Sequence, residues 1–447
     1  MNLEDCRGVP VSTTSRTSLD RSETAIELML GFSGDPLAIV DKAVAEDPSF
    51  VMGHCLRASL LLSTFDTSLY AQARASVTDA EGLNKGANGR ERDHTSALAA
   101  WASGDVERAG VTYTEVLLEH PLDALALQMG NTIDYFLGDS TSMMARVKQV
   151  LPHWREAVPG YGHVQGMYAF ALEESGQCAL AEQVGLRALQ LNARDAWAVH
   201  ALAHVYETDG RQATGIQCLT KRERDWSIDN ALAIHNWWHV ALFYFDLGEI
   251  DQVLGLYDKR IRESGSRILM DLVDASALLW RLHLRSSDLA NRPNELAEAW
   301  ETVIAEQRSA FAAVHAMMAF VLAGREHAAQ RLLAQLAAGG KRDDLFGTMV
   351  RLVGLPASRA IYDFMHGDYS AAVTLLEQSW PYQQRLGGSN TQRDVLMLTL
   401  IEAALRAKST ALAKDLAEKR LLMRPRSPYS KELADRALLR DTATRAR

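Results

Sequence analysis

The sequence predicts an all-α protein, a right-handed solenoid of helical hairpins. Apolar residues recur at spacings of three and four, as in the run Leu180, Val184, Ala188 and Leu191, and this is the period of an amphipathic helix. Only 11 of the 447 residues are proline, so few positions interrupt a helix. No segment shows the Val/Ile/Thr-rich alternation that is typical of a strand. A chain of this length accommodates about nine or ten hairpins.

Glycine-centred turns divide the chain at regular intervals. The first five are 34, 38, 34 and 38 residues apart. The turns lie at Gly104, Gly138, Gly176, Gly210, Gly248, Gly324 and Gly367. Glycine suits the left-handed position that follows the end of a helix. The gap of 76 residues between Gly248 and Gly324 is twice 38, so we expect an atypical repeat between them, around residues 285–288.

One long repeat array is the simplest domain organisation for this length. We expect an N-terminal arm at residues 1–20, a single helical repeat domain at 21–440 and a C-terminal tail at 441–447. The chain from Arg420 onward is locally basic, with Arg424, Arg426, Lys431, Arg436 and Arg440. Because an array needs a polar end, we interpret this stretch as a solvated capping helix.

Composition and charge favour a folded cytoplasmic protein. Hydrophobic residues make up 47% and charged residues 23% of the chain, which is ordinary for a globular protein. The net charge of −9 argues against nucleic acid as a partner. No apolar run is long enough for a membrane span, and the N-terminus lacks the features of a secretory signal. The four scattered cysteines indicate free thiols rather than a disulfide framework.

Two histidine pairs are the strongest functional signal. His200 and His204 are four residues apart, as are His235 and His239, and the two pairs are offset by 35 residues. A spacing of four places both imidazoles of a pair on one helix face. An offset of 35 residues is close to one helical-hairpin repeat. We therefore expect neighbouring repeats to present four imidazoles toward one surface.

The repeat pattern resembles the tetratricopeptide repeat, a helical hairpin of about 34 residues that stacks into a superhelix. Tyr206 and Tyr244 lie four residues before their turn glycines, as the tyrosine of that motif does. Ala109 and Pro121 fall in register after Gly104. The Trp-x-x-Leu-Gly-x-x-Tyr signature is never complete in this chain.

A closer resemblance covers roughly residues 20 to 440. It is carried by the stretches His200–Glu207, Ile234–His239 and Gly387–Asp394, which look like tetratricopeptide repeat protein 38 and its bacterial relatives. That family has no generally assigned reaction, so the resemblance implies the architecture and no activity.

By analogy with the repeat, the first helix of each hairpin lines a concave surface. On that register, seven histidine and glutamate side chains converge on one central pocket. They are His163, Glu174, His200, His204, Glu207, His235 and His239. Trp238 and Tyr161 would add apolar walls.

The sequence leaves three functional interpretations open, beside a purely structural role for the histidines. The first is a metal site for zinc or another divalent ion, with the predicted ligands His200, His204, His235 and His239. The second is an enzyme, a hydrolase or lyase, with or without a metal, with the predicted catalytic residues His200, His204, His239, Glu174 and Glu207. The third is a groove that binds its ligand without chemistry.

We predict binding of a small molecule or peptide as the main function, with the enzyme as the alternative and a homodimer left open. The predicted ligand-binding residues are His163, His235, Asn236, Trp238, Tyr161, Asp271 and Arg393. Asp271 and Asp274 lie in an otherwise apolar helix, where a carboxylate must have a partner or line a cavity. Arg393 belongs to the 387–394 stretch of the resemblance. The chain lacks the nucleophile-elbow, phosphate-loop and dinucleotide motifs of familiar enzymes.

Overall fold

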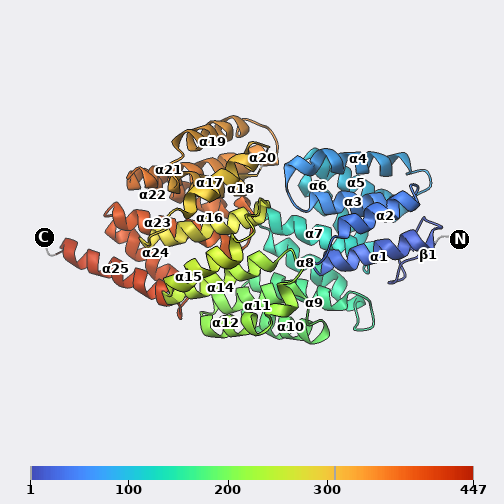
Figure 1. The fold of residues 1–447 in the computed structure, drawn as a ribbon, viewed down its shortest axis with the longest axis horizontal. Coiled ribbons are helices and arrows are strands. Elements are labelled where there is room, and N and C mark those ends of the chain that lie inside the picture. Colours follow the sequence, from blue (N-terminus) through green and yellow to red (C-terminus); the bar gives the residue numbers. More distant parts are fainter. Residues whose placement is uncertain (1–2, 307–308, 446–447) are drawn as a thin grey trace. The chain divides into compact units, whose positions relative to one another are not determined.

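The computed structural model describes residues 3–306 and 309–445 (Figure 1). The described chain is an all-α solenoid of tetratricopeptide-like helical hairpins, which confirms the predicted fold class. It contains two compact units, one formed by residues up to 202 with 224–233 and the other by residues 203–223 with those from 234 onward. The predicted concave pocket concerns both units together and stays a prediction, as do the predicted domain boundaries.

The first unit is a series of hairpins in which each helix from α1 to α10 packs against the next. It begins with a short antiparallel pair, β1 (Leu3–Glu4) and β2 (Pro10–Val11). Its helices are α1 (Arg16–Leu30), α2 (Pro36–Glu46), α3 (Val51–Leu62), α4 (Tyr70–Gly82), α5 (Gly89–Ser103), α6 (Val106–Glu119), α7 (Ala124–Leu137), α8 (Ser140–Val150), α9 (Tyr161–Glu174) and α10 (Cys178–Leu191). The first unit also contains three short helical segments, the 3₁₀ helices η1 (Thr67–Leu69) and η2 (Leu151–His153) and the α-helix α13 (Glu223–Trp226). Helix α11 (Ala196–Thr208) continues into the second unit.

In the second unit, α16 packs on α18 and α23, and α18 packs on α21. Its helices are α12 (Gln212–Lys221), α14 (Ala233–Leu247), α15 (Ile250–Leu256), α16 (Leu269–Leu284), α17 (Arg292–Val303), α18 (Ala310–Leu322), α19 (Glu326–Gly339), α20 (Leu345–Met349), α21 (Leu355–Met365), α22 (Tyr369–Ser379), α23 (Asn390–Arg406), α24 (Thr410–Met423) and α25 (Pro428–Arg445). Short segments of other helix types are η3 (Tyr257–Ile261), η4 (Ile304–Glu306), η5 (Val350–Gly354) and η6 (Trp380–Leu386).

The predicted turn glycines all adopt left-handed backbone conformations. Their φ angles run from 64° at Gly324 to 100° at Gly104. The atypical repeat is also explained, because Ser286, 38 residues after Gly248, has φ of 61°. Its amide donates to the His283 carbonyl at 2.8 Å. A serine therefore takes the turn position that glycine takes elsewhere, at some conformational cost.

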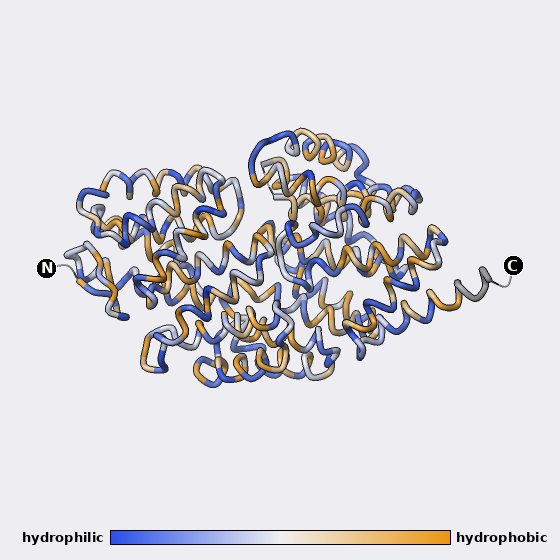
Figure 2. Tube along the Cα trace, turned by 180° about the vertical axis from the view of Figure 1, so that it is seen from behind, coloured by the Kyte–Doolittle hydropathy of each residue, from blue (hydrophilic) through white to orange (hydrophobic). Residues whose placement is uncertain are grey.

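Buried tryptophans connect the layers of the second unit. The Trp280 indole N–H donates to Thr399 Oγ1 at 2.8 Å, joining α16 to α23, and the Trp300 N–H donates to Ser276 Oγ at 2.8 Å, joining α17 to α16. Both side chains are fully buried, and a buried aromatic that also satisfies its polar atom is a strong packing element. Figure 2 shows apolar and polar residues alternating along the helices, as the predicted amphipathic period requires.

The basic C-terminal stretch is solvated only in part: Arg426 and Lys431 are exposed, whereas the interpretation was wrong for Arg420 and Arg424. Arg420 is 3% exposed and forms an ion pair with Asp394 at the start of α23. Arg424 forms an ion pair with Glu207 at 2.9 Å. These two arginines belong to the interior of the second unit, where their charges have partners. None of the described helices has the length and apolar character that crossing a bilayer requires.

Candidate functional site

Three histidines of the second unit lie close together in its interior, with their rings tilted or edge-on to one another. His204 comes from α11, and His235 and His239 come from successive turns of α14. The ring centroids are 4.6 Å apart for His204 and His239, and 4.9 Å apart for His235 and His239. One potential ligand atom from each ring lies within 4.8 Å of the others. We call these three residues the histidine centre; all three are buried.

Two carboxylates lie close to Nδ1 atoms of the histidine centre. His235 Nδ1 lies 2.7 Å from Asp274 Oδ2 on α16. His239 Nδ1 lies 3.4 Å from Glu207 Oε2 on α11. The hydrogen bond between His235 Nδ1 and Asp274 favours the tautomer that leaves the lone pair on Nε2, which is the usual arrangement around histidine ligands of metals.

The electrostatic environment favours a neutral imidazole at the middle of the centre. Burial lowers the pKa of His239 well below its ordinary value, and the positive charges that His204, His235 and Arg281 can carry lower it further. A neutral imidazole can accept a metal ion or a hydrogen bond, whereas a protonated one cannot.

Two aspartates lie one turn apart on α16, beside His235. Asp274 is fully buried, and its Oδ1 atom has no hydrogen-bond partner among the residues that the structure describes. Asp271 accepts a hydrogen bond from Ser266 Oγ at 2.5 Å. Burial raises the pKa of Asp271 to about 6, the hydrogen bond from Ser266 opposes this rise, and the negative charge of Asp274 adds to it. This carboxyl therefore titrates close to neutral pH.

Trp238 and Arg281 close one side of the histidine centre. The Trp238 ring stacks on His235, with centroids 5.3 Å apart and an interplanar angle of 19°. The guanidinium carbon of Arg281 lies 5.4 Å from the centroid of the Trp238 ring. Arg281 donates to the carbonyls of Ala277 at 3.2 Å and Thr391 at 2.8 Å. Cation–π contact and backbone hydrogen bonds hold this buried charge in place.

Two other predicted site residues, His163 and His200, belong to the first unit. His163 belongs to the first unit, where its Nε2 is 3.2 Å from Glu27 Oε1 and its Nδ1 is 3.6 Å from Asp195 Oδ2. His200, also in the first unit, packs against Phe170 and Trp197 at centroid distances of 5.1 and 4.7 Å. The roles predicted for both stay predictions.

The remaining predicted residues are also placed. Tyr161 begins α9 and is half-buried, while Glu174 ends the same helix and is buried. Asn236 is buried on α14 next to His235. Arg393 donates to the carbonyls of Gly387 and Gly388 and, at 2.8 Å, to Asn390 Oδ1. Arg393 thus anchors its own loop and the start of α23.

Sequence reasoning missed Arg281, Arg424 and Asp394 around the centre. A usable signal existed for Arg281, because it interrupts the apolar run Leu278-Leu279-Trp280-Arg281-Leu282. A charged residue in the middle of such a run needs a partner or a cavity.

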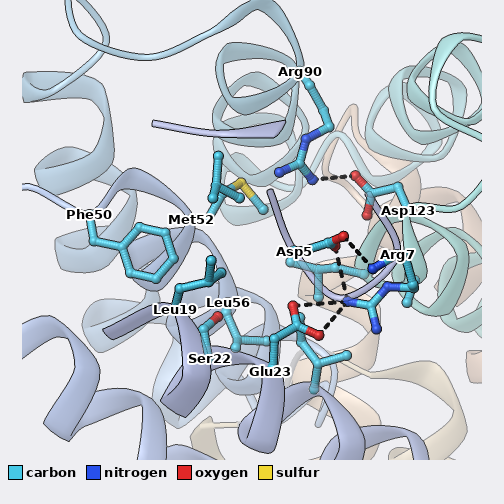
Figure 3. Close-up of a pocket in the computed structure, with 14 residues that line it drawn as sticks. Asp5, Arg7, Leu19, Ser22, Glu23, Phe50, Met52, Leu56, Arg90 and Asp123 are labelled. Carbon is cyan, nitrogen blue, oxygen red and sulfur yellow. Dashed lines mark hydrogen bonds and ion pairs between the residues drawn. The ribbon is translucent and has the colours of Figure 1, made fainter. Parts of the chain in front are cut away.

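A small cavity of the first unit is lined by ion pairs (Figure 3). Its volume of about 20 Å³ is enough for one or two waters. Arg90 forms an ion pair with Asp123 at 2.6 Å, and Arg7 pairs with Asp5 at 3.1 Å and Glu23 at 2.9 Å. These arginines have carboxylate partners within the unit, so the cavity has the features of a structural ion cluster.

No family model matches the chain, so its resemblance to the tetratricopeptide repeat protein 38 family stays a prediction. Among solved structures, it is similar to the human IFIT1 dimer with m7Gppp-AAAA, at 14% identity, covering 94% of this chain and 93% of that chain with a TM-score of 0.42. It is also similar to yeast Tom70, at 12% identity, 97% and 90% coverage and a TM-score of 0.36. The Cut9–Hcn1 hetero-tetramer of APC/C follows at 12% identity, 95% and 96% coverage and a TM-score of 0.36. These similarities are too distant to indicate a ligand or a reaction.

Proposed function

We propose that the histidine centre binds one divalent transition-metal ion, and that this helical-repeat protein uses the resulting site to bind a small molecule. The observation that carries the proposal is the grouping of three buried imidazoles whose potential ligand atoms lie within 4.8 Å of one another. Two of these imidazoles have a carboxylate at Nδ1.

The donor set fits zinc better than a hard cation. Imidazole nitrogens suit zinc and its neighbours in the first transition series, whereas magnesium and calcium prefer oxygen ligands. Three histidines also leave a coordination position for a water or a ligand, as is typical of catalytic rather than structural zinc sites. The unpartnered Oδ1 atom of Asp274 adds negative charge that would favour a cation nearby.

The residues at such a site would have two roles, as metal ligands and as groups that orient those ligands. His204, His235 and His239 would hold the ion, and Asp274 and Glu207 would keep the rings of His235 and His239 in their orientations. A bound zinc ion would supply a Lewis acid. Burial and the positive neighbours of His239 keep protons off the ring, so metal would compete with protons successfully at neutral pH.

A hydrolytic reaction is the second candidate, and the observation that favours it is Asp271. Its pKa of about 6 lets this carboxyl accept and return a proton near neutral pH, which is what a general base requires. Its position one turn from Asp274 places it beside the carboxylate that contacts His235.

The test is the metal content of untagged protein after dialysis against zinc, measured by plasma mass spectrometry. We expect about one zinc per wild-type chain and a loss of most of it in His239→Ala. His315→Ala is the matched control, because it removes a buried histidine of α18 that contacts the Phe311 carbonyl at 2.8 Å. Wild-type protein without zinc, or a His239→Ala variant that keeps it while folded by circular dichroism, would overturn the proposal.

A further inference from the structure

Arg281 lies next to the histidine centre and has no ion-pair partner of its own among the described residues. Arg420 and Arg424 are each paired with a carboxylate, Asp394 and Glu207 respectively. Arg281 is 2% exposed, and within residues 3–306 and 309–445 no carboxylate lies within ion-pair distance of it. The fields of Asp394 and Glu207 reach Arg281, but each of these carboxylates is already shared with another arginine. A buried charge without an ion-pair partner is costly.

Arg281 keeps both its charge and spare hydrogen-bond donors. Burial lowers the pKa of its guanidinium to about 10, against the fields of Asp394 and Glu207, which raise it. The group is therefore protonated at neutral pH. A guanidinium has five N–H donors, and the described contacts of Arg281 are with two backbone carbonyls, those of Ala277 and Thr391.

Two residues that contact Arg281 carry polar groups without described hydrogen-bond partners. Trp238 is fully buried, and its indole N–H has no hydrogen-bond partner in the described part of the chain. Thr391, whose carbonyl accepts from Arg281, is 1% exposed, and its hydroxyl also lacks a described partner. Buried polar groups are normally satisfied, so three neighbouring donors with unused capacity indicate a missing acceptor.

We propose that Arg281, Trp238 and Thr391 form an oxyanion site that holds the carboxylate or phosphate group of the small molecule bound at the histidine centre. This inference rests on the proposed function for the ligand's other contacts. A guanidinium binds both oxyanions through paired N–H donors, and indole and hydroxyl groups add single hydrogen bonds. Trp238 stacks on His235, so the oxyanion site adjoins the centre. The ligand class is a small organic acid or a phosphate ester.

The experiment titrates acetate and inorganic phosphate separately into the full-length protein, in zinc-loaded and zinc-free form, by calorimetry. We expect one of the two anions to bind with one site per chain. Arg281→Met should weaken that binding about tenfold or more, because hydrogen bonds to a charged group are strong. Trp238→Phe and Thr391→Val remove one donor each with little change of shape, and each should weaken it several-fold.

Matched controls separate recognition from packing. Trp280→Phe removes an indole N–H that already has Thr399 as its acceptor, and Arg285→Met removes an arginine one turn from Arg281 that pairs with Glu432. Neither should change anion affinity. If Arg281→Met does not fold, Arg281→Lys keeps the charge and loses the paired donors, and it should still weaken binding.

Zinc content measured on the same samples distinguishes failure of this inference from failure of the proposed function. Arg281→Met should keep its zinc. If neither anion binds wild-type protein in either form, or binding is equal in wild type and the folded Arg281, Trp238 and Thr391 variants, the oxyanion site is overturned even where zinc is bound. If zinc is absent but anion binding depends on Arg281, the oxyanion site stands and the metal proposal fails.

Discussion

The two units bury histidines in opposite ways. In the first unit, His94 lies 2.8 Å from Asp123, which Arg90 also contacts, and His163 lies between Glu27 and Asp195. His94 and His163 each have a carboxylate partner and no second imidazole among their described ring contacts. In the second unit, three imidazoles adjoin one another and share two carboxylates. Carboxylate partners stabilise a proton on histidine, whereas clustered imidazoles disfavour it.

The pKa shifts follow this difference. Burial alone would lower the pKa of His163, but the hydrogen bond to Glu27 and the charges of Asp195 and Glu27 raise it. The pKa of His239 is lowered by burial and by its positive neighbours. The surroundings of His163 therefore favour its protonated form, whereas those of His239 disfavour it. The metal ion that we propose would bind His239 in place of a proton.

The largest effect is expected where the first unit's ion cluster is broken. Asp123→Ala leaves the buried Arg90 without its carboxylate, and we expect a loss of about 3–5 kcal/mol in the free energy of unfolding. Urea denaturation measures it, with and without zinc. The control Asp258→Ala breaks the more exposed ion pair with Arg292, which should cost less than about 1 kcal/mol. Equal losses in the two variants would contradict a closed internal cluster.

The second expected effect concerns zinc affinity. Asp274→Asn keeps the shape of the side chain but weakens its hold on His235, and we expect zinc affinity to fall about 10–100-fold. Competition with a chromogenic chelator measures the affinity. Asp195→Asn makes the same change next to His163 in the first unit and should leave zinc affinity unchanged. If Asp274→Asn leaves zinc affinity unchanged, the carboxylate next to His235 has no role in metal binding that Asp195 lacks.

The third expectation is an opposite response of two histidines to pH. The pKa of His163 is raised in the folded state, so its stabilising contribution is present below pH 6.5 and is lost as pH rises through the folded value. The pKa of His239 is lowered, so its contribution is present above pH 6.5 and is lost as pH falls. NMR titration of the imidazole signals in metal-free protein checks both directions. Parallel shifts of the two residues would refute this contrast.

The smallest change in unfolding free energy is expected when Glu27, the exposed partner of His163, is replaced. Glu27→Gln removes a partner of His163 whose side chain is 62% exposed, so unfolding free energy should change by less than about 1 kcal/mol. The pKa of His163 should fall at the same time. Glu46→Gln, which removes an exposed carboxylate paired with Arg21, is the control and should leave the pKa of His163 where it is.

The fold could be predicted because its signals are local. Helical periodicity and turn glycines act within one hairpin, and the left-handed angles at Gly104 through Gly367 confirm them. The grouping of His204, His235 and His239 also followed from local spacing plus one repeat offset. Their use of Asp274 and Glu207 depends on how α11, α14 and α16 pack, which helical periodicity does not specify.

The error at the C-terminus has a clear physical cause. Arg420 and Arg424 were interpreted as solvated because a repeat array needs a polar end. Their partners Asp394 and Glu207 lie 26 and 217 residues earlier in the chain, and nothing in the local composition marks a pairing at such a distance. Arg281 was overlooked for the related reason that its contact with Thr391 spans 110 residues.

The ion pair between Glu207 and Arg424 can form only late in synthesis, since the two residues are 217 positions apart. Two further contacts lie nearby. Ser427 Oγ donates to Asp246 Oδ1 at 2.5 Å. Arg426 packs closely on Gly210, because a Cβ atom added to Gly210 would lie 3.0 Å from the carbonyl carbon of Arg426. Because chains emerge N-terminus first, the helices that carry the histidines are made long before the segment that fixes Glu207. A nascent or truncated chain that ends before Arg424 would contain every proposed metal ligand. It would lack the arginine that pairs with Glu207, the carboxylate next to His239. The carboxylate nearest His239 would then gain its arginine partner only when the last hairpin has been made.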